Sequence, residues 1–215
     1  MTIRRRATEV QGERIPLPGT RGATHSKRTC ANLGRAITQI LKEPAPEILD
    51  LGPFCGETVV FLAQRGARVH VESFEPPPPI PPRKRGDPPP VFPPLRLDQP
   101  DQKFNMILAW EQGDFVPPER LNEFGTEMER VLKEGGWLFL FSLMRPREKV
   151  EAPARYRLVA DDGVVREATK ERRRRRWDHS TRDIERALKG FSIQSVRLQR
   201  DQMREFVALK AKPKT

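Results

Sequence analysis

Two short stretches of the sequence have the residue types of a nucleoside-binding site. The first runs from Asp50 to Gly56, reads DLGPFCG, and begins at the end of a short apolar run. The second is Glu72, which ends the next apolar run and stands about 20 residues after Gly52. A carboxylate there can accept hydrogen bonds from both hydroxyls of a ribose, and glycines let the backbone approach a ligand closely. We therefore expect a site for a nucleoside-containing cofactor.

The same stretch distinguishes between nucleoside cofactors. A dinucleotide site requires the pattern G-x-G-x-x-G, with the N-terminus of the following helix directed at a pyrophosphate. Here the corresponding residues are Gly52, Phe54 and Glu57. A phosphate would meet the Glu57 carboxylate, which disfavours a nicotinamide-dependent oxidoreductase. S-adenosylmethionine, a nucleoside joined to an amino acid, carries no phosphate and suits the stretch.

These residues must be positioned by the elements that flank them. Apolar residues at strand or helix spacing, with prolines and glycines between them, predict alternating strands and helices. We expect helices over residues 26–42, 56–65, 117–134 and 180–188, strands over 47–51, 68–72, 95–98, 104–110, 137–143, 191–198 and 205–210, and a hairpin over 156–165. This alternation predicts a doubly wound α/β sheet with helices on both faces, and such sheets bind ligands at the carboxyl ends of their strands.

In their order and spacing, these features resemble those of the class I S-adenosylmethionine-dependent methyltransferases. The resemblance covers about residues 30–143 and extends to about residue 210 with the terminal strand pair. Its most specific part is LKEGGWLF over residues 132–139, which is similar to an L-K-P-G-G motif before a hydrophobic strand. Residues 104–110 correspond to the fourth-strand motif of the family. The resemblance implies a Rossmann-like, mostly parallel seven-stranded sheet with a reversed last strand.

The resemblance also implies which residues bind the cofactor S-adenosylmethionine. The family's D-x-G-x-G-x-G loop falls on Asp50 to Gly56, with Phe54 in place of the middle glycine. Glu72 corresponds to the acid that binds the ribose, and Asp98 to the acid that helps to hold the adenine. The cofactor-binding residues implied in this way are Asp50, Gly52, Phe54, Gly56, Glu72, Asp98 and Trp110.

The loop after the fourth strand is where the family places groups that face the methyl acceptor. Glu111 and Asp114 lie there, and either could act as a base where the acceptor must lose a proton. The alternative is that both are solvated loop carboxylates. The sequence has no N-P-P-Y or D-P-P-Y motif, which argues against methylation of amino groups on DNA bases or glutamine. Neither the acceptor nor the oligomeric state is predicted.

Positive charge is concentrated in two segments. The chain has 40 Lys and Arg residues against 29 Asp and Glu residues, a net charge of +11. The excess lies mainly in residues 1–35 and 166–176. Such segments suit nucleic acid, although arginine runs are also common on solvated surfaces. The candidate nucleic-acid surface comprises Arg172, Arg173, Arg174, Arg175 and Arg176. The alternative function is therefore a catalytically inactive methyltransferase-like module that binds RNA or another polyanion.

Length and composition predict one domain with excursions. With 215 residues, 36% of them hydrophobic, the chain can build a core, and we place a single methyltransferase-like domain in residues 26–212. Residues 1–25 are expected to form a flexible basic arm, with a mitochondrial transit peptide as the alternative. Residues 76–94 hold 11 of the 22 prolines, which predicts an extended excursion, either a stiff connector or a ligand for an aromatic groove.

The remaining composition argues against membrane insertion, disulfides and metal. No apolar run has the length of a membrane-spanning helix, and the N-terminal residues lack an apolar signal region, so we expect a soluble, cytoplasmic protein. Cys30 and Cys55 form no CxxC pair, and His25, His70 and His179 lack metal-ligand spacing. We therefore expect neither a disulfide framework nor a bound metal.

Overall fold

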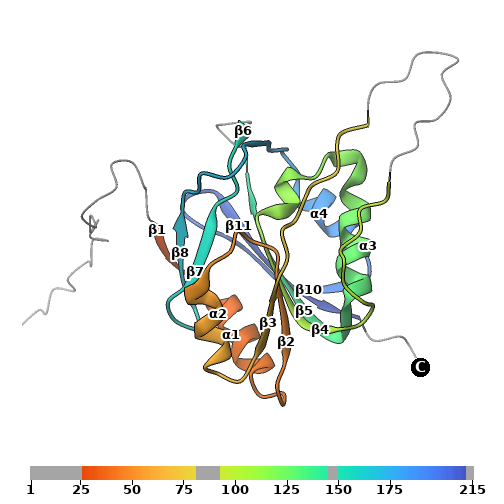
Figure 1. Ribbon diagram of the computed structural model, residues 1–215. Coiled ribbons are helices and arrows are strands. Elements are labelled where there is room, and N and C mark those ends of the chain that lie inside the picture. Colours follow the sequence, from red (N-terminus) through yellow and green to blue (C-terminus); the bar gives the residue numbers. More distant parts are fainter. Residues whose placement is uncertain (1–25, 81–92, 145–149, 212–215) are drawn as a thin grey trace, which may run out of the picture.

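The centre of the computed structural model, which describes residues 26–80, 93–144 and 150–211, is a six-stranded sheet (Figure 1). The strands of this sheet are β2 (Glu47–Asp50), β3 (Arg68–Val71), β4 (Phe104–Trp110), β5 (Leu132–Leu143), β10 (Phe191–Leu198) and β11 (Met203–Lys210). They follow the order β10-β11-β5-β4-β2-β3. Strands β3, β2, β4 and β5 are parallel, and β11 runs antiparallel to both of its neighbours.

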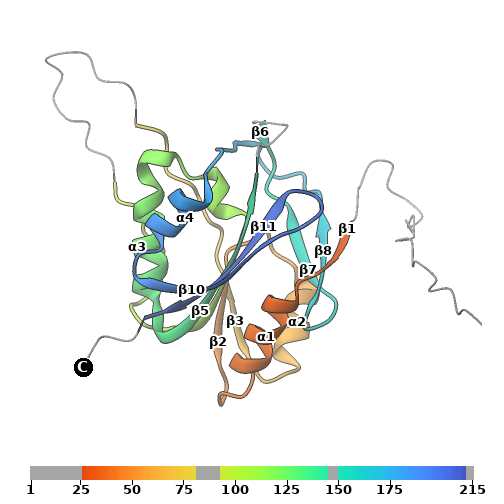
Figure 2. The same cartoon turned by 180° about the vertical axis from the view of Figure 1, so that it is seen from behind.

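Two pairs of helices cover the two faces of this sheet. The helices are α1 (Ala31–Ile40), α2 (Gly56–Ala63), α3 (Leu121–Val131) and α4 (Thr181–Ala187). Figures 1 and 2 show α1 and α2 on one face and α3 and α4 on the other. Leu33 of α1 and Leu62 of α2 belong to one buried cluster, whereas Met128 of α3 and Ile184 of α4 belong to the other. The predicted doubly wound α/β architecture is confirmed.

Strand β4 shows why this sequence forms a central strand. Met106 and Leu108 join the cluster under α1 and α2, and Ile107 and Ala109 join the cluster under α3 and α4. A central parallel strand is buried on both faces, so it requires a continuous apolar run rather than an alternating one. The run FNMILAW meets this requirement, and the predicted strand over residues 104–110 is confirmed.

Smaller elements lie beside the main sheet. They are the strands β1 (Ser26–Thr29), β6 (Val150–Glu151), β7 (Arg155–Leu158), β8 (Gly163–Glu167) and β9 (Arg174–Arg175) and the 3₁₀ helices η1 (Gln112–Phe115) and η2 (Pro118–Arg120). Strand β8 pairs with both β1 and β7, and β6 pairs with β9. We call residues 150–179, which connect β5 to α4 after the undescribed residues 145–149, the crossover segment.

The main sheet has six strands rather than the seven predicted, because residues 95–98 do not form a strand. Their backbone N–H groups donate hydrogen bonds to carboxylates and not to a neighbouring strand. The N–H groups of Leu95 and Leu97 donate to the side chains of Glu123 and Glu127 on α3, at 3.1 and 2.6 Å. Strand β3 is therefore an edge of the main sheet.

Two further boundaries differ from the prediction. Residues Ser26–Thr29 form strand β1, paired with β8, and not the first turn of a helix, so α1 begins only at Ala31. The helix predicted over residues 117–134 is α3, which begins after η2 and ends at Val131. Gly135 has φ +71°, a conformation that favours glycine, within the first part of β5.

Other predicted elements are confirmed. The hairpin over residues 156–165 is the β7–β8 pair. Ser180 caps α4 by a capping box: its side chain accepts a hydrogen bond from the Asp183 N–H, and the Asp183 side chain accepts one from the Ser180 N–H. This reciprocal bonding satisfies two donors at the helix N-terminus.

Several predictions fall wholly or partly outside the described residues. The predicted basic arm over residues 1–25 lies outside them, as do residues 81–92 of the proline-rich stretch. The described ends of that stretch, residues 76–80 and 93–94, have neither helix nor strand. In the part of the chain that the structure describes, no helix is long and apolar enough to cross a membrane.

Candidate cofactor-binding site

The two predicted acidic positions lie side by side at the carboxyl ends of β2 and β3. These strands are parallel neighbours, and Asp50 is paired with Val71 across them. The Glu72 N–H donates to the Asp50 carbonyl oxygen at 3.0 Å. Parallel strands expose their carboxyl ends at the same edge, so the loop from Asp50 to Gly56 and the segment after Glu72 face one common space.

Asp50 shapes the loop that follows β2. Its buried Oδ1 accepts hydrogen bonds from the Gly52 N–H at 2.9 Å and from Trp110 Nε1 at 2.7 Å. A Cβ on Gly52 would lie 2.6 Å from Trp110 Cδ1, so only glycine fits there. Burial raises the pKa of Asp50 to about 6, although the bonds from Gly52 and Trp110 oppose this shift.

Trp110 supports this loop from inside the protein. It ends β4 with φ +48°, and its ring stacks on Tyr156 with 4.9 Å between ring centroids and 7° between planes. The ring belongs to the buried cluster under α1 and α2 and lines neither hollow described below. Trp110 and Asp50 therefore hold the loop in shape together.

Two adjoining hollows lie at this edge of the sheet. The loop hollow, of about 190 Å³, is lined by Leu51, Gly52, Pro53, Phe54, Val71, Ser73, Phe74, Gln112, Glu171 and Arg174. The proline hollow, of about 300 Å³, is lined by residues 72–78, 93–97 and Arg120. Both are lined by Ser73 and Phe74, so one elongated ligand can occupy the two together. Ligand pockets of this kind typically have volumes of a few hundred Å³.

One residue that lines each hollow has a buried side-chain oxygen that makes no hydrogen bond to the described residues. Glu72 Oε1 accepts from the Asp98 N–H at 3.0 Å, but Glu72 Oε2 is buried without a partner there. Gln112, only 2% exposed, likewise has an Oε1 with no partner among the described residues. A buried acceptor left unpaired costs about 1–3 kcal/mol, so a water molecule or a ligand that supplies a donor would stabilise each of them.

The remaining predicted cofactor residues have different positions. Phe54 lines the loop hollow, but its side chain is largely exposed, at 67%, and does not fill the space. Gly56 begins α2 and lines neither hollow. Asp98 contributes its backbone N–H to Glu72, and its exposed side chain also lines neither hollow.

Glu111 and Asp114, the candidate bases, are buried ion-pair partners and not solvated loop carboxylates. Arg176, itself buried, contacts Glu111 at 3.0 Å and Asp114 at 2.7 Å. Glu111 also accepts hydrogen bonds from the Ala154 N–H and the Tyr156 hydroxyl. Neither carboxylate lines the loop hollow, and both hold the crossover segment through Arg176.

The pKa values of these two acids are shifted in opposite directions. Burial would raise the pKa of Glu111, but Arg176 and Arg166 outweigh burial and lower it. Burial raises the pKa of Asp114 to about 6 despite Arg176, which acts in the opposite direction. Arg176 has a raised pKa, because its acidic partners outweigh the effect of burial, and it therefore stays charged.

The arginine run does not form one continuous charged surface. Arg176 is buried, and Arg174 lines the loop hollow and donates to the Phe74 carbonyl at 2.6 Å and to Glu75 at 2.8 Å. Arg175, between them, is exposed and stacks over Trp177 at 3.9 Å. Two of the five arginines of the predicted nucleic-acid surface are thus paired with acids that lie far away in the sequence.

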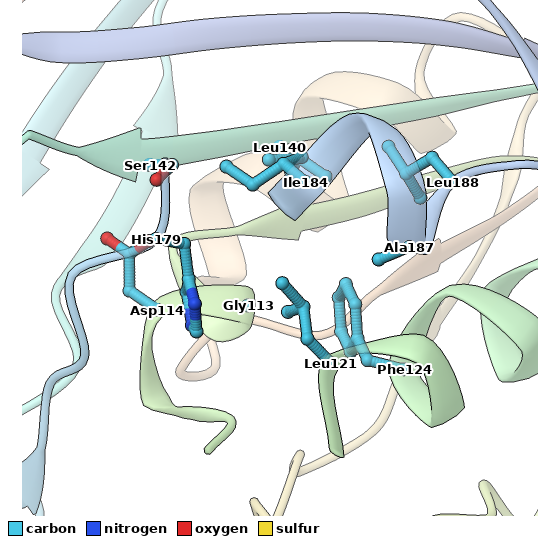
Figure 3. Close-up of a pocket in the computed structure, with 10 residues that line it drawn as sticks. All are labelled: Gly113, Asp114, Leu121, Phe124, Leu140, Ser142, His179, Ile184, Ala187 and Leu188. Atoms are coloured by element: carbon cyan, nitrogen blue, oxygen red, sulfur yellow. The ribbon is translucent and has the colours of Figure 1, made fainter. Parts of the chain in front are cut away.

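A separate small pocket lies beneath η1, between α3, α4 and β5. Figure 3 shows Asp114, Ser142 and His179 at one end and Leu121 and Phe124 toward the other. Its volume of about 10 Å³ is close to that required by a single water molecule, so it cannot hold a cofactor. Within the described residues, no group of three or more His, Cys, Asp or Glu side chains could hold a metal ion.

The sequence analysis missed several residues that line the two hollows. Ser73 and Phe74 follow the predicted ribose acid directly, so their position in the sequence could have indicated them. Gln112 lies two residues after strand β4, a second position at the ligand-binding edge. Glu171 and Arg174 could not have been found in this way, because the crossover segment brings them from far along the chain.

Comparisons with known proteins identify the fold. No family model and no curated protein matches the chain. An S-adenosylmethionine-dependent methyltransferase from Mesorhizobium loti aligns over 82% of this chain and 96% of its own, with 15% identity and a TM-score of 0.52. A SAM-dependent methyltransferase from Methanosarcina mazei aligns over 81% and 97%, with 17% identity and a TM-score of 0.51.

A third structure was solved with ligands bound. It is 1,6-didemethyltoxoflavin-N1-methyltransferase from Burkholderia thailandensis, with 1,6-didemethyltoxoflavin and S-adenosylhomocysteine. It aligns over 84% of this chain and 77% of its own, with 13% identity and a TM-score of 0.50. The chain therefore has the α/β fold of the class I S-adenosylmethionine-dependent methyltransferases.

Proposed function

We propose that this protein is an S-adenosylmethionine-dependent methyltransferase. The observation that carries the proposal is the Glu72 carboxylate at the end of β3. Asp98 satisfies one oxygen, and the other is buried without a partner among the described residues, beside the proline hollow. The two hydroxyls of a ribose are donors of the kind that this carboxylate requires. The shared fold supports the same cofactor.

The two hollows suit the two ends of this cofactor. Glu72 marks the proline hollow as the place for the adenosine, and the loop hollow, with Gly52 and Gln112, is left for the amino-acid end. Gly52 lines the loop hollow, and packing against Trp110 requires glycine there, since a Cβ would strike the indole ring. Ser73 and Phe74, which line both hollows, would contact the middle of the ligand.

The chemistry of the reaction requires mainly positioning. S-adenosylmethionine supplies a methyl group on a positively charged sulfur, and its transfer is an in-line displacement that depends on alignment of the acceptor. The proposal includes no general base, because Glu111 and Asp114 are both ion-paired with Arg176 and neither lines the loop hollow. The contribution of the protein is to hold the cofactor at the end of the sheet and to exclude water there.

Titration calorimetry with S-adenosylmethionine and S-adenosylhomocysteine tests the proposal. We expect the wild-type protein to bind both with micromolar affinity. Glu72→Gln keeps the shape of the side chain but replaces one acceptor oxygen by a donor, so it should weaken binding at least about tenfold, because a hydrogen bond to a charged group contributes about 1.5–3 kcal/mol. The control Glu43→Gln, at an exposed residue just beyond α1, should leave affinity unchanged.

Two results would contradict the proposal. One is the absence of binding to the wild-type protein at millimolar ligand. The other is a Glu72→Gln protein that binds both ligands as tightly as wild type does. Circular dichroism of each variant shows whether the variants are folded, so that a loss of binding can be attributed to the site.

A further inference from the structure

Residues 72–75 follow β3 and include the two residues that line both hollows. Because β3 is an edge strand, strand pairing holds this segment on one side only. The Glu72 N–H donates to the Asp50 carbonyl oxygen, but within the described residues no backbone hydrogen bond joins the next three residues to another backbone group. The Phe74 ring is buried against Phe124, with 5.6 Å between ring centroids. The main chain beside that ring requires a contact of another kind.

Arg174 of the crossover segment supplies this contact. Its Nη1 donates to the Phe74 carbonyl oxygen at 2.6 Å, and its Nη2 donates to Glu75 Oε1 at 2.8 Å. A guanidinium carries its donors in a rigid fork, so one arginine can fix a carbonyl and a neighbouring carboxylate together. The Arg174 side chain is 12% exposed and that of Glu75 is 73% exposed, so water screens the ion pair. The bond to the Phe74 carbonyl is the one that holds the main chain.

The strand that carries Arg174 is itself anchored. It is β9, which pairs with β6. Two residues later, Arg176 is buried in contact with Glu111 and Asp114. The next residue, Trp177, donates its N–H to the Asp114 carbonyl oxygen at 2.7 Å. Arg174 therefore connects the segment after β3 to the loop after β4, and both of these line the loop hollow.

We propose that Arg174 is a positioning residue of the cofactor site. It fixes the main chain at Phe74 and thereby the carboxylate of Glu72, two residues earlier, that binds the ribose. This role rests on the proposed function and gives the crossover segment a part in cofactor binding. Hydrogen bonds weaken steeply when distance or angle changes, so a binding group needs neighbours that hold it in place.

Two ligands distinguish this role from direct contact with the amino-acid end of the cofactor. S-adenosylhomocysteine has that end, and 5′-methylthioadenosine has the same nucleoside and thioether without it. Arg174→Met keeps an aliphatic stem and removes both donors. In calorimetric titrations of the full chain, it should weaken both ligands by the same factor of about ten, the loss expected for one hydrogen bond to a charged group.

Two further variants complete the titrations. Arg174→Lys keeps a donor for the Phe74 carbonyl and should bind both ligands to within a few-fold of wild type. Arg172→Met, the same change at an exposed residue of the same arginine run, is the matched control and should leave both affinities unchanged.

A double-mutant cycle with Glu72→Gln tests whether Arg174 acts through Glu72. Effects on one shared interaction are not additive, so Arg174→Met should weaken binding less than about twofold when Glu72 is already replaced. Circular dichroism shows whether each variant is folded. If Arg174→Met is not folded, Arg174→Gln, which keeps a donor for one of the two acceptors, takes its place in the titrations and the cycle.

Three results would overturn the role of Arg174. The first is a loss of affinity for S-adenosylhomocysteine alone, which would mean that Arg174 binds the amino-acid end itself. The second is unchanged affinity for both ligands, and the third is an effect that adds in full to that of Glu72→Gln. If wild type binds neither ligand, the proposed function fails and the role of Arg174 with it; if wild type binds both and one of these three results is found, the role of Arg174 alone fails.

Discussion

Asp50 is an acid whose charged form is disfavoured in the folded protein. It is buried at the end of β2, and burial raises its pKa from 3.8 to about 6. Because the folded-state pKa exceeds the unfolded one, the folded state binds more protons between about pH 4 and pH 6. The contribution of Asp50 to stability is therefore most favourable below pH 4 and falls as the pH rises through this window.

Asp50→Asn tests this reasoning. The amide oxygen can still accept from Gly52 and Trp110, but it carries no charge at any pH. A shift of about two pKa units corresponds to about 3 kcal/mol. We therefore expect the free energy of unfolding of the variant, relative to wild type, to increase by about this amount between pH 4 and pH 7. Urea denaturation at both pH values measures it, and an equal difference at the two would contradict the assignment.

Arg176 connects two elements of the fold, because it lies in the crossover segment and binds acids in the loop after β4. It contacts Glu111, Asp114 and Glu151. Arg176→Ala leaves Asp114 buried without the cation that contacts it and Glu111 with only Arg166, at 3.7 Å, and loss of one partner of a buried pair typically costs about 3–5 kcal/mol. Urea denaturation at pH 7 should show a loss of this size. Arg175→Ala, at the exposed neighbour, should change stability by no more than about 0.5 kcal/mol, and equal effects of the two would contradict the account.

The contact between α3 and α4 depends on Gly125. A Cβ at this position would lie 1.8 Å from the carbonyl oxygen of Ala187, which is backbone and cannot move aside cheaply. Alanine favours a helix by about 1 kcal/mol over glycine, but the clash opposes this gain. We expect Gly125→Ala to destabilise the protein by about 2 kcal/mol or more. The control Gly113→Ala places its Cβ 3.6 Å from Phe124, which is an ordinary contact. Thermal melts should show a clearly lower melting temperature for Gly125→Ala than for Gly113→Ala. A Gly125→Ala protein as stable as wild type would show that the helices do not pack this closely.

The accuracy of the sequence predictions also varies by element. Strand β4 was predictable because a strand buried on both faces requires a continuous apolar run. The strand predicted over residues 95–98 was wrong because Leu95 and Leu97 alternate as in a strand while their donors bond to Glu123 and Glu127 of α3. Those partners are distant in sequence, so no local pattern reveals them.

The candidate site was predictable to a similar extent. The acids at the ends of β2 and β3 could be located from the lengths of two short apolar runs and the glycines after them. The roles of Glu111 and Asp114 could not, because their partner Arg176 lies more than 60 residues away in the sequence. The sequence alone predicts that an arginine run lies on the surface, because it does not show which distant acids pair with part of the run.

At the scale of the whole molecule, the loop hollow joins parts that are far apart in the sequence. The ends of β2 and β3 form one side, and Glu171 and Arg174 of the crossover segment contribute to another. A ligand bound there should stabilise the fold as a unit. At a ligand concentration of 100 Kd, binding to the folded state alone contributes about 2.7 kcal/mol.

This stabilisation is measurable as a shift in melting temperature. For a protein of this size, 2.7 kcal/mol corresponds to a rise of about 5–10 °C. We expect S-adenosylhomocysteine at saturating concentration to raise the melting temperature of wild type by this amount and that of Glu72→Gln by less at the same ligand concentration. If the ligand left the melting temperature of wild type unchanged, this result would contradict a site at this edge of the sheet.

The most direct test of the central claim is a crystal structure of the protein with S-adenosylhomocysteine. We predict one ligand across both hollows, with its ribose hydroxyls within hydrogen-bond distance of Glu72. A ligand found elsewhere on the molecule, or a complex in which Glu72 makes no contact with the ribose, would contradict it.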